Sequence, residues 1–248
     1  MQIPQGTVYE KRTYRHSFKD ADLVSFTVSV KETDLFIRAC RDMTEEALAA
    51  VEECRRPLEA YIQDHPLFLH SLLPVAVTMD APGIVKEMAQ ASNLAGVGPM
   101  AAVAGAVAEF VGRRLLNHSS EIIVENGGDI FMQIKQKRLI GIYAGMSPFS
   151  DKLALEIEPE QTPLGVCTSS GTVGPSLSLG TADAAIVLAP SAALADAAAT
   201  AVGNCVKGQN DIETALDAGR KIAGISGVVI IIGDMIGAWG NIKLANTG

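Results

Sequence analysis

Hydrophobic and polar residues alternate near the start of the chain, in the pattern of β structure. Residues 13–18 and 23–39 alternate with a period of two, as the half-buried strands of a hairpin or meander do. Apolar positions then recur with helical spacing over residues 44–64. This spacing predicts a helix that Thr44 caps, with Pro57 as a candidate kink. The first quarter of the chain is therefore predicted to form strands followed by one long helix.

Strands and helices alternate along the rest of the chain. After an irregular stretch at residues 74–85, a glycine-rich turn leads into a small-residue helix over 96–116. We expect hairpins at 121–134 and 227–244, strands at 138–145, 152–159 and 184–190, and helices at 191–204 and 210–223. This order predicts an α+β (mixed α/β) fold. Strands followed by a helix occur twice, which suggests two related halves of one domain over 1–248, divided near residue 92.

Composition and charge exclude several classes of protein. Of 248 residues, 48% are hydrophobic and 19% are charged, so the chain can bury a large core. The net charge of −8 argues against a nucleic-acid partner, which requires a basic surface. The longest apolar run, residues 222–233, is shorter than the ~20 residues of a membrane span, and no signal peptide is visible. With Cys40, Cys54, Cys167 and Cys205 scattered, we expect a cytoplasmic protein with free thiols and no membrane partner.

The first candidate for ligand binding is the turn at residues 96–100. Gly98 and Pro99 suit a tight turn into the first helical position, and the amides at a helix start can hold an anion. The alanines that follow leave room for a sheet or a ligand to approach. Close packing of helix on sheet explains the same residues, so both interpretations of Gly98 stay open.

The second candidate is the segment Asn126-Gly127-Gly128-Asp129, between two apolar strands. Asn-Gly is a favoured pair for a tight hairpin turn, and this structural role alone explains the segment. In the functional alternative, the glycine amides line a pocket and Asp129 accepts hydrogen bonds from a ligand.

Hydroxyl residues and glycines gather in a predicted loop from Cys167 to Gly180. Thr168, Ser169, Ser170 and Gly171 offer hydroxyls and amides that suit a phosphate. An ordinary surface loop has the same composition, so this segment alone does not decide between the two.

Asp196 and Thr200 are the candidate metal ligands. They are separated by one turn of a predicted helix and share a face, which Asn204 continues. A carboxylate beside a hydroxyl suits Mg²⁺ that is also held by ligand phosphates and water. A solvated aspartate on an exposed helix face is the structural alternative.

No histidine or cysteine pattern indicates another site. His16, His65, His70 and His118 lack the spacing of metal ligands or of a catalytic triad, and Cys167 is expected to be a buried thiol. Any site should therefore come from the four segments above. We predict that these segments line one cleft, with Asp196 close to residues 126–129.

In their order along the chain, these segments resemble the ApbE-like superfamily, whose characterised members are Mg²⁺-dependent FAD:protein FMN transferases. The resemblance covers about residues 96–204 and rests on the small-residue helix, on residues 123–130 (IVENGGDI), on Ser169-Ser170-Gly171 and on residues 189–200 (APSAALADAAAT). The last segment is the most specific, because it looks like the family's helix in which an aspartate and a threonine bind the metal.

The resemblance implies duplicated T-fold-like units, with strands backed by helices and FAD held between the two halves. It also implies that Asp196 and Thr200 contact Mg²⁺ near the pyrophosphate, with Gly127, Gly128 and Asp129 beside the cofactor. In the transferases, the metal makes the pyrophosphate a better electrophile while a threonine of a target protein attacks and AMP leaves. FAD or FMN, Mg²⁺ and a protein substrate are therefore the implied partners.

Two motifs of the transferases are missing from this sequence. Residues 171–180 contain neither the histidine nor the Asp-Pro pair that follows the family's Ser-Gly. Residues 101–105 have no lysine where the family has Ala-Lys-Gly. The chain looks closer to a cytoplasmic branch, found in bacteria and archaea, that keeps GVGPMAAVAG and ENGGD. These departures argue against ordinary FMN transfer and leave another phosphorylated ligand open.

Three classes of function stay open on the sequence alone. The leading one is an ApbE-like site for a phosphate-bearing ligand, a flavin or a nucleotide, assisted by Mg²⁺; FMN transfer is one reaction within this class. The second is a ligand-binding module without turnover. The third is a scaffold that acts through protein partners, and the apolar content also allows a homodimer.

Overall fold

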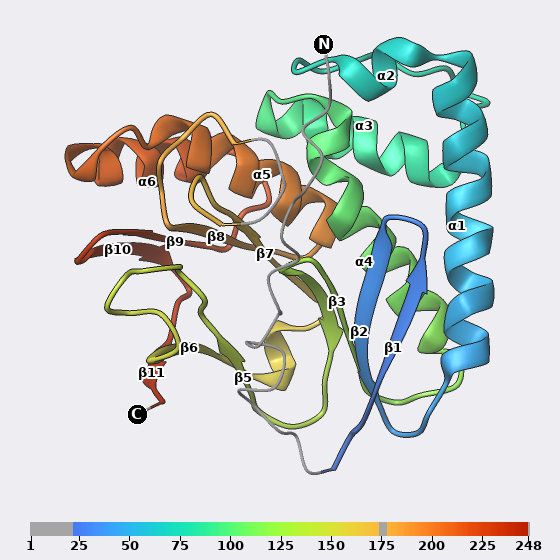
Figure 1. Cartoon of the computed structure of the whole chain (residues 1–248), viewed down its shortest axis with the longest axis horizontal. Coiled ribbons are helices and arrows are strands. Elements are labelled where there is room, and N and C mark those ends of the chain that lie inside the picture. Colours follow the sequence, from blue (N-terminus) through green and yellow to red (C-terminus); the bar gives the residue numbers. More distant parts are fainter. Residues whose placement is uncertain (1–21, 174–177, 248) are drawn as a thin grey trace.

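The main feature of the computed structural model, which describes residues 22–173 and 178–247, is an eight-stranded sheet (Figure 1). All neighbouring strands in this sheet are antiparallel. In spatial order the strands are β1 (Val24–Val30), β2 (Thr33–Ala39), β3 (Ile122–Asn126), β4 (Asp129–Gln133), β7 (Leu164–Ser169), β8 (Ala184–Ala189), β9 (Gly227–Ile232) and β10 (Met235–Gly240).

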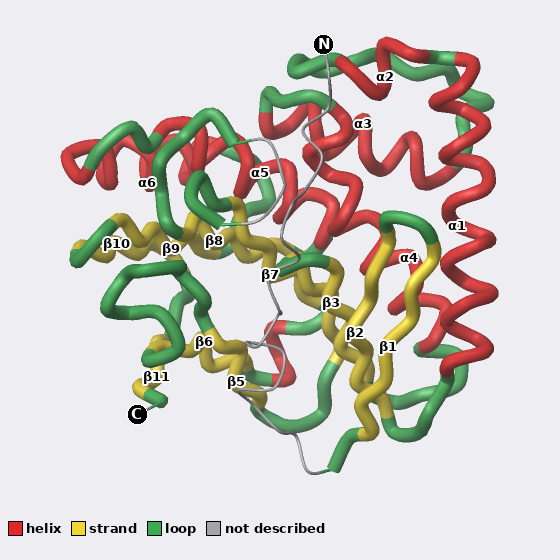
Figure 2. Tube along the Cα trace, viewed as in Figure 1, coloured by secondary structure: helices red, strands yellow, loops and turns green. Residues whose placement is uncertain are grey.

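Helices cover one face of this sheet, and a three-stranded sheet covers part of the other (Figures 1 and 2). The α-helices are α1 (Thr44–Asp64), α2 (Pro66–His70), α3 (Gly83–Ala95), α4 (Val103–Leu115), α5 (Ala192–Cys205) and α6 (Ile212–Lys221). Short 3₁₀ helices are η2 (Pro99–Ala102), η3 (Pro159–Gln161) and η4 (Gln209–Asp211). The small sheet contains β5 (Arg138–Gly141), β6 (Leu153–Ile157) and β11 (Leu244–Asn246), in the order β11-β6-β5.

The two layers create two hydrophobic cores, one on each face of the main sheet. Val124 and Cys167 belong to the core on the helix side, whereas Ile123 and Val166 belong to the core on the side of the small sheet. Neighbouring residues of one strand thus face opposite layers, as the alternation of side chains along a strand requires.

The order of the elements contains two similar units. The first is the β1–β2 pair, the helices α1 to α4 and the β3–β4 pair; the second is the β7–β8 pair, the helices α5 and α6 and the β9–β10 pair. The units join where β4 pairs with β7. The predicted α+β fold, with strands backed by helices, is confirmed. Residue 92, where we expect from the sequence that the halves divide, lies inside α3, and the division of the domain into two halves stays a prediction.

One predicted helix cap and one predicted loop boundary are wrong. Helix α1 begins at Thr44, but Thr44 is not the capping acceptor, because the Asp42 carboxylate accepts hydrogen bonds from the Thr44 amide (2.9 Å) and hydroxyl (2.7 Å). The predicted loop at 167–180 begins later, because β7 continues to Ser169 through its pairing with β8. The predicted strand at 13–18 lies outside the described residues.

Glycines allow α4, α5 and β7 to approach closely. A Cβ atom at Gly105 of α4 would lie 2.2 Å from the carbonyl oxygen of Ala192, the first residue of α5. A Cβ atom at Gly165 of β7 would lie 2.4 Å from the Cα atom of the same alanine. The start of α5 is therefore packed against the backbones of both α4 and β7, and this packing positions the site described below.

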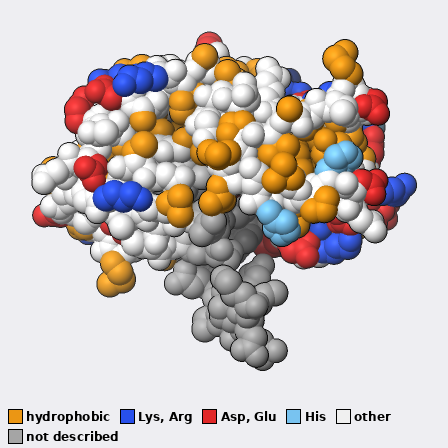
Figure 3. Space-filling model, turned by 90° about the horizontal axis from the view of Figure 1, so that it is seen from above, with side chains coloured by type: hydrophobic (Ala, Val, Ile, Leu, Met, Phe, Trp, Pro, Cys, Tyr) orange, Lys and Arg blue, Asp and Glu red, His pale blue; other side chains and the backbone are white. Residues whose placement is uncertain are grey.

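Large apolar side chains remain exposed around α2 and the segment that follows it. They are Leu67, Leu72, Leu73 and Met79. Apolar side chains also gather on the face of the molecule seen from above in Figure 3. A homodimer or a protein substrate would cover apolar surface of this kind, and both stay predictions.

Among the described residues, no single helix has both the length and the apolar content of a membrane span. In the part of the chain that the structure describes, one pair of helical segments, Gly83–Ala95 and Pro99–Leu115, reaches this length and apolar content together, across a bend of 104°.

Candidate functional site

Two of the segments singled out in the sequence, residues 126–129 and the helix that carries Asp196, meet at the start of α4. The side-chain amide of Asn126, at the end of β3, donates to the carbonyl oxygen of Ala104 at 3.1 Å. The Asp196 carboxylate on α5 accepts the amide N–H of the next residue, Gly105, at 2.9 Å. Asn126 and Asp196 therefore contact successive residues of one helix turn. The expectation that Asp196 lies close to residues 126–129 agrees with these contacts.

Asp129 lies beside this helix start, on the helix side of the sheet. It pairs with Asn126 across the β3–β4 turn, and its carboxylate accepts the amide of Thr168 at 3.2 Å. Alternation along β7 directs the side chains of Cys167 and Ser169 towards the helices and that of Thr168 towards the opposite face. The backbone amide of Thr168, rather than its hydroxyl, thus reaches Asp129.

Asp129 and Asp196 are carboxylates in surroundings that disfavour their charge. Burial raises the pKa of Asp196 to about 7, although hydrogen bonds from the amides of Gly105 and Ala104 oppose the shift. Burial also raises the pKa of Asp129 well above its ordinary value, and the nearby charge of Asp196 raises it further. Within residues 22–173 and 178–247, no lysine or arginine forms an ion pair with either carboxylate. A cation beside these two groups would therefore be stabilised.

Cys167 is a buried thiol next to the two carboxylates. Its sulfur donates a hydrogen bond to the Ala192 carbonyl oxygen at 3.3 Å. Burial raises the pKa of this thiol well above its ordinary value, and the charges of Asp129 and Asp196 act in the same direction. Cys167 is therefore protonated near neutral pH, as expected of a structural thiol.

Two backbone amides of the candidate ligand-binding segments already have partners within the chain. The Gly128 amide donates to the Glu125 carboxylate at 2.8 Å. The Gly171 amide donates to the Ala182 carbonyl oxygen, also at 2.8 Å. An anion bound here would have to compete for these donors and would also face the carboxylates of the site.

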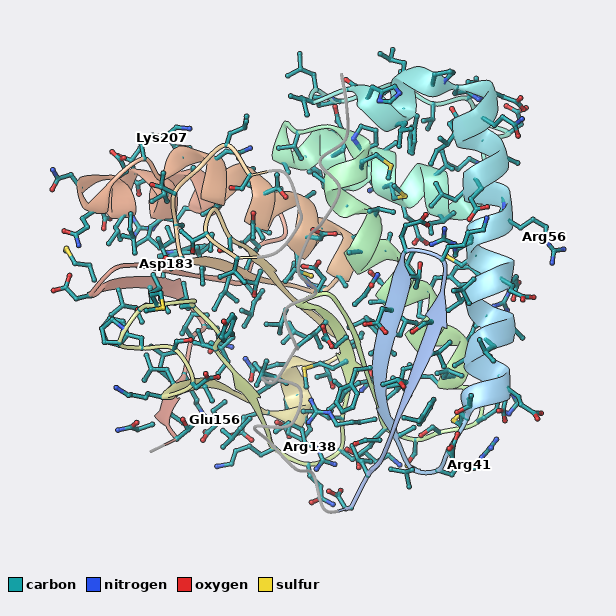
Figure 4. All side chains as sticks on the ribbon, in the orientation of Figure 1. Arg41, Arg56, Arg138, Glu156, Asp183 and Lys207 are labelled. Atoms are coloured by element: carbon teal, nitrogen blue, oxygen red, sulfur yellow. The ribbon has the colours of Figure 1, made fainter. Side chains whose placement is uncertain are left out.

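The hydroxyls of the 170–173 segment hold that segment in place. The Ser170 hydroxyl accepts the amides of Thr172 at 3.1 Å and Val173 at 2.9 Å. The Thr172 hydroxyl donates to the carboxylate of Asp183, labelled in Figure 4, at 2.9 Å. These groups stabilise the loop itself, so their composition is not by itself a sign of phosphate binding. Residues 174–177 of the hydroxyl-rich segment lie outside the described residues.

Thr200 and Asn204 continue the face of α5 that carries Asp196, one helical turn at a time. Thr200 is partly exposed, and the side chain of Asn204 accepts the amide of Leu179 at 2.9 Å. Lys207, labelled in Figure 4, donates to the carbonyl oxygen of the same leucine. Asn204 therefore holds the end of the loop, and Asp196 with Thr200 stays the candidate metal-binding pair.

The glycines of the candidate segments are explained by different features of the structure. A Cβ atom at Gly98 would lie 1.8 Å from the carbonyl oxygen of Ser71, so close packing explains this glycine. Gly127 and Gly128 both have positive φ, at 68° and 104°, and together they form the turn between β3 and β4. The turn is thus centred on Gly127 and Gly128 rather than on an Asn-Gly pair, because Asn126 still pairs within the sheet. A ligand-binding role for these glycines stays a prediction.

One residue of this region, Glu109, is absent from the sequence motifs. Glu109 is buried on α4, and its carboxylate accepts the amide of Ala192 at the start of α5, at 2.8 Å. A glutamate in a helix built mainly of small residues is a usable signal, because a charge buried there needs a partner.

Within the described ranges, no group of three or more His, Cys, Asp or Glu side chains could hold a metal ion. An ion at Asp196 would therefore need ligand phosphates and water to complete its coordination, which is common for Mg²⁺.

His65 stacks on Tyr61, with ring centroids 4.0 Å apart, and His16 lies outside the described residues.

The fold is that of the ApbE flavin transferases. The apo form of the flavinyl transferase ApbE from Pseudomonas stutzeri aligns with a TM-score of 0.58 over 88% of this chain and 94% of that chain, at 15% identity. The flavin transferase ApbE from Vibrio cholerae aligns with a TM-score of 0.56 over 88% of this chain and 96% of that chain, at 13% identity. At these identities, the likeness establishes the fold.

The chain belongs to the family described as AbpE bacteria, whose model matches residues 15–244. A UPF0280 protein of Methanococcus vannielii is 42% identical over 227 residues, which are 89% of this chain and 92% of the relative. A UPF0280 protein of Methanothrix thermoacetophila is 44% identical over 200 residues, 80% of this chain and 84% of the relative. The resemblance to the ApbE-like superfamily that the motifs indicate is thus confirmed.

Proposed function

We propose that this protein binds a phosphate-bearing ligand, a flavin or another nucleotide, together with Mg²⁺ at the start of α4. In this proposal the Asp196 carboxylate and the Thr200 hydroxyl hold the ion, and Asp129 lies beside it. Two of the proteins that share the fold are described as a flavinyl transferase and a flavin transferase, which supports a flavin as the first ligand to test.

One observation carries the proposal: two neighbouring carboxylates lie where the candidate segments meet, and no lysine or arginine of the described residues pairs with them. Burying a carboxylate without a counter-charge is unfavourable. A divalent cation offsets this charge and attracts phosphate oxygens at the same time. Because the amides of Gly128 and Gly171 have partners within the chain, the cation has to supply much of the attraction for an anionic ligand.

The residues present fit Mg²⁺, since carboxylate and hydroxyl oxygens are the ligands that this hard ion prefers. The Gly105 amide, bound to the Asp196 carboxylate, fixes the orientation of that side chain. Asn126 fixes the adjacent turn of α4 through its hydrogen bond to Ala104. When bound, Mg²⁺ would polarise the phosphate oxygens of the ligand and make the phosphorus atom more electrophilic.

Calorimetric titration of FAD into metal-free protein, with and without Mg²⁺, tests the proposal. We expect Mg²⁺ to tighten binding by at least about tenfold, because the ion offsets the carboxylate charge. Asp196→Asn keeps an acceptor for the Gly105 amide but removes the charge, so it should stay folded and lose the Mg²⁺ effect. Asp217→Asn, at an exposed position on α6, is the matched control and should bind like the wild type.

An Asp196→Asn variant with an unchanged Mg²⁺ effect would contradict the metal role of Asp196. If FAD does not bind, ADP tests the chemistry that the two ligands share, because both contain a diphosphate. Binding of neither ligand in either condition would contradict the proposal. Release of AMP from FAD, measured by chromatography, would distinguish a transferase from a binding module.

A scaffold function is the second candidate, and a specific observation favours it. Asp196 binds Gly105, Asn126 binds Ala104, and the amide of Gly171 is paired, so each motif also has a structural role. A pure scaffold should bind neither FAD nor ADP, and in that case Asp196→Ala should lower thermal stability through the lost contact to α4.

A further inference from the structure

The starts of α4 and α5 are each held by a carboxylate from the other helix. Glu109 of α4 accepts hydrogen bonds at the start of α5, from the Ser191 hydroxyl at 2.9 Å and the Ala192 amide at 2.8 Å. Asp196 of α5 accepts the amide of Gly105 at the start of α4. Unpaired amides at a helix start are stabilised by a carboxylate, so each contact secures one helix end. The two helices are therefore linked reciprocally.

Glu109 is only 1% exposed, and each of its carboxylate oxygens has partners. One oxygen, Oε2, accepts the donors of α5, including a longer contact of 3.4 Å from the Ala193 amide. The other oxygen, Oε1, forms an ion pair with Arg113, one turn later on α4. The guanidinium of Arg113 also lies 3.6 Å from the Glu87 carboxylate. The charge of Glu109 is thus balanced and its orientation is fixed.

The position of Asp196 depends on where α5 begins. Asp196 follows Ala192 by one helical turn, a rise of about 6 Å. On α4, Gly105 precedes Glu109 by one turn in the same way. The contact between Glu109 and Ala192 and the contact between Asp196 and Gly105 are therefore separated by about one helical turn on both α4 and α5. A displacement of the start of α5 from Glu109 would also displace the Asp196 carboxylate.

We propose that Glu109 is a positioning residue of the metal site: by holding the start of α5, it sets where Asp196 and Thr200 lie relative to the ligand. This inference rests on the proposed Mg²⁺-dependent function. Glu109 does not itself bind the ion, because its two oxygens are used by Arg113 and by α5. Residues that orient metal ligands from behind commonly change metal affinity by about 10–100-fold when they are replaced.

Electron paramagnetic resonance of Mn²⁺, used in place of Mg²⁺ and titrated in the presence of FAD, measures the metal affinity of the folded protein. Glu109→Gln has nearly the same size but a single oxygen, so it cannot serve both Arg113 and α5. We expect Mn²⁺ binding to weaken by about tenfold and the spectrum of bound Mn²⁺ to change. Glu87→Gln is the matched control, because it also removes a carboxylate near Arg113 but no hydrogen bond to the described residues of α5; its affinity should stay within about twofold of the wild type.

The possible results lead to different conclusions. A lower melting temperature of Glu109→Gln with wild-type Mn²⁺ affinity would overturn the positioning role, because it would show a structural contact only. Absence of Mn²⁺ binding by the wild-type protein would instead overturn the proposed function, and this inference with it. Should Glu109→Gln fail to fold, Ser191→Ala decides, since it removes one donor to Glu109 together with only a long contact of 3.4 Å from the Leu194 amide. Mn²⁺ affinity weakened by about threefold or more would support the proposal, and unchanged affinity would overturn it.

Discussion

The two ends of β3 place charged side chains in opposite situations. At its beginning, Arg138 (labelled in Figure 4) is 5% exposed and pairs with Glu121 at 2.9 Å and with Asp22 at 2.7 Å. The hydrogen bond from Arg138 lowers the pKa of Asp22 to about 2. At the other end of β3, burial raises the pKa of Asp129 and of Asp196, and within the described residues neither is paired with a lysine or arginine.

This difference separates a structural charge cluster from a candidate binding site. A buried charge that is paired within the chain destabilises the fold strongly when its partner is removed. Carboxylates with raised pKa values and no cationic partner are instead typical of places where an ion or a ligand supplies the missing charge. The Mg²⁺-dependent function is therefore proposed for the Asp196 end of β3 and not for the Arg138 end.

The largest effect should come from placing a cationic side chain beside Asp196, so that its carboxylate is paired as Glu121 is paired with Arg138. Thr200→Lys places an ammonium group one helical turn after Asp196, where oppositely charged side chains pair. We expect the Mg²⁺ effect on FAD affinity to fall from at least about tenfold to under about twofold, because the lysine offsets the carboxylate charge. Calorimetry with and without Mg²⁺ measures this change.

Thr200→Val is the control for that substitution, since it removes only the hydroxyl and should reduce the Mg²⁺ effect in part. A Thr200→Lys protein that binds FAD with wild-type Mg²⁺ dependence would show that the cation does not lie on this face of α5.

Removing the cation from the Arg138 end should change stability and leave ligand binding intact. Arg138→Met leaves Glu121 buried without its partner, so we expect a loss of about 3 kcal/mol in the free energy of unfolding. Urea denaturation measures this loss. Lys137→Met is the matched control, because its ion pair with Glu156 is exposed and should contribute less than about 1 kcal/mol. If Arg138→Met were as stable as the wild type, the charges at the Arg138 end of β3 would not have the structural role that distinguishes them from Asp129 and Asp196.

A smaller effect should appear in the pH dependence of stability of the metal-free protein. Asp196, with a pKa of about 7, binds its proton more tightly in the folded than in the unfolded chain, where the value is about 3.9. Its stabilising contribution is therefore present in acid and is lost as the pH rises through about 7. Asp22 has a lowered pKa of about 2, so its contribution is present above about pH 4 and is lost as the pH falls through about 2.

Urea denaturation of two variants in the presence of EDTA measures both trends. Asp196→Asn should gain stability over the wild type as the pH rises from about 4 to about 8. Asp22→Asn should be less stable than the wild type near pH 6, and the difference should shrink towards about pH 2. If the free energy of unfolding of both variants changed with pH in the same way as that of the wild type, the pKa shifts of Asp196 and Asp22 would be contradicted.

The smallest effect concerns one thiol at each end of β3. Cys40 is exposed at the Arg138 end, where hydrogen bonds with the Ser119 and Ser120 hydroxyls lower its pKa to about 7. Cys167, at the Asp196 end, is buried and has a raised pKa. Iodoacetamide near neutral pH should therefore modify Cys40 first and leave Cys167 intact, as peptide mass spectrometry would show. Cys40→Ser should lose the fast reaction; rapid modification of Cys167 in the native protein would contradict its burial.

Local patterns in the sequence predict most of the fold. Alternation predicts β1 and β2, and helical spacing predicts α1 with the observed ends, Thr44–Asp64. The helix α3 is absent from the predicted elements, because its apolar positions are mixed with small and polar residues. The joining of the two units at β4 and β7 cannot be derived from periodicity, since it depends on how distant segments pair.

The motifs predict which segments form the candidate site, but tertiary contacts decide what each residue does. The contact of Asp196 with Gly105 joins residues 91 positions apart, and that of Glu109 with Ala192 joins residues 83 apart. No local pattern reveals such contacts. The composition of the hydroxyl-rich segment also cannot show that the Ser170 hydroxyl accepts amides of its own loop.

Diffraction from crystals grown with Mn²⁺ and FAD, using the anomalous signal of manganese, locates the metal relative to Asp196 and Thr200. We expect an anomalous peak at the Asp196 carboxylate and the Thr200 hydroxyl, beside the diphosphate of the bound FAD. A map in which FAD is bound and no manganese lies at Asp196 would contradict the metal role of Asp196, and the Asp196 carboxylate would then serve only to hold the start of α4.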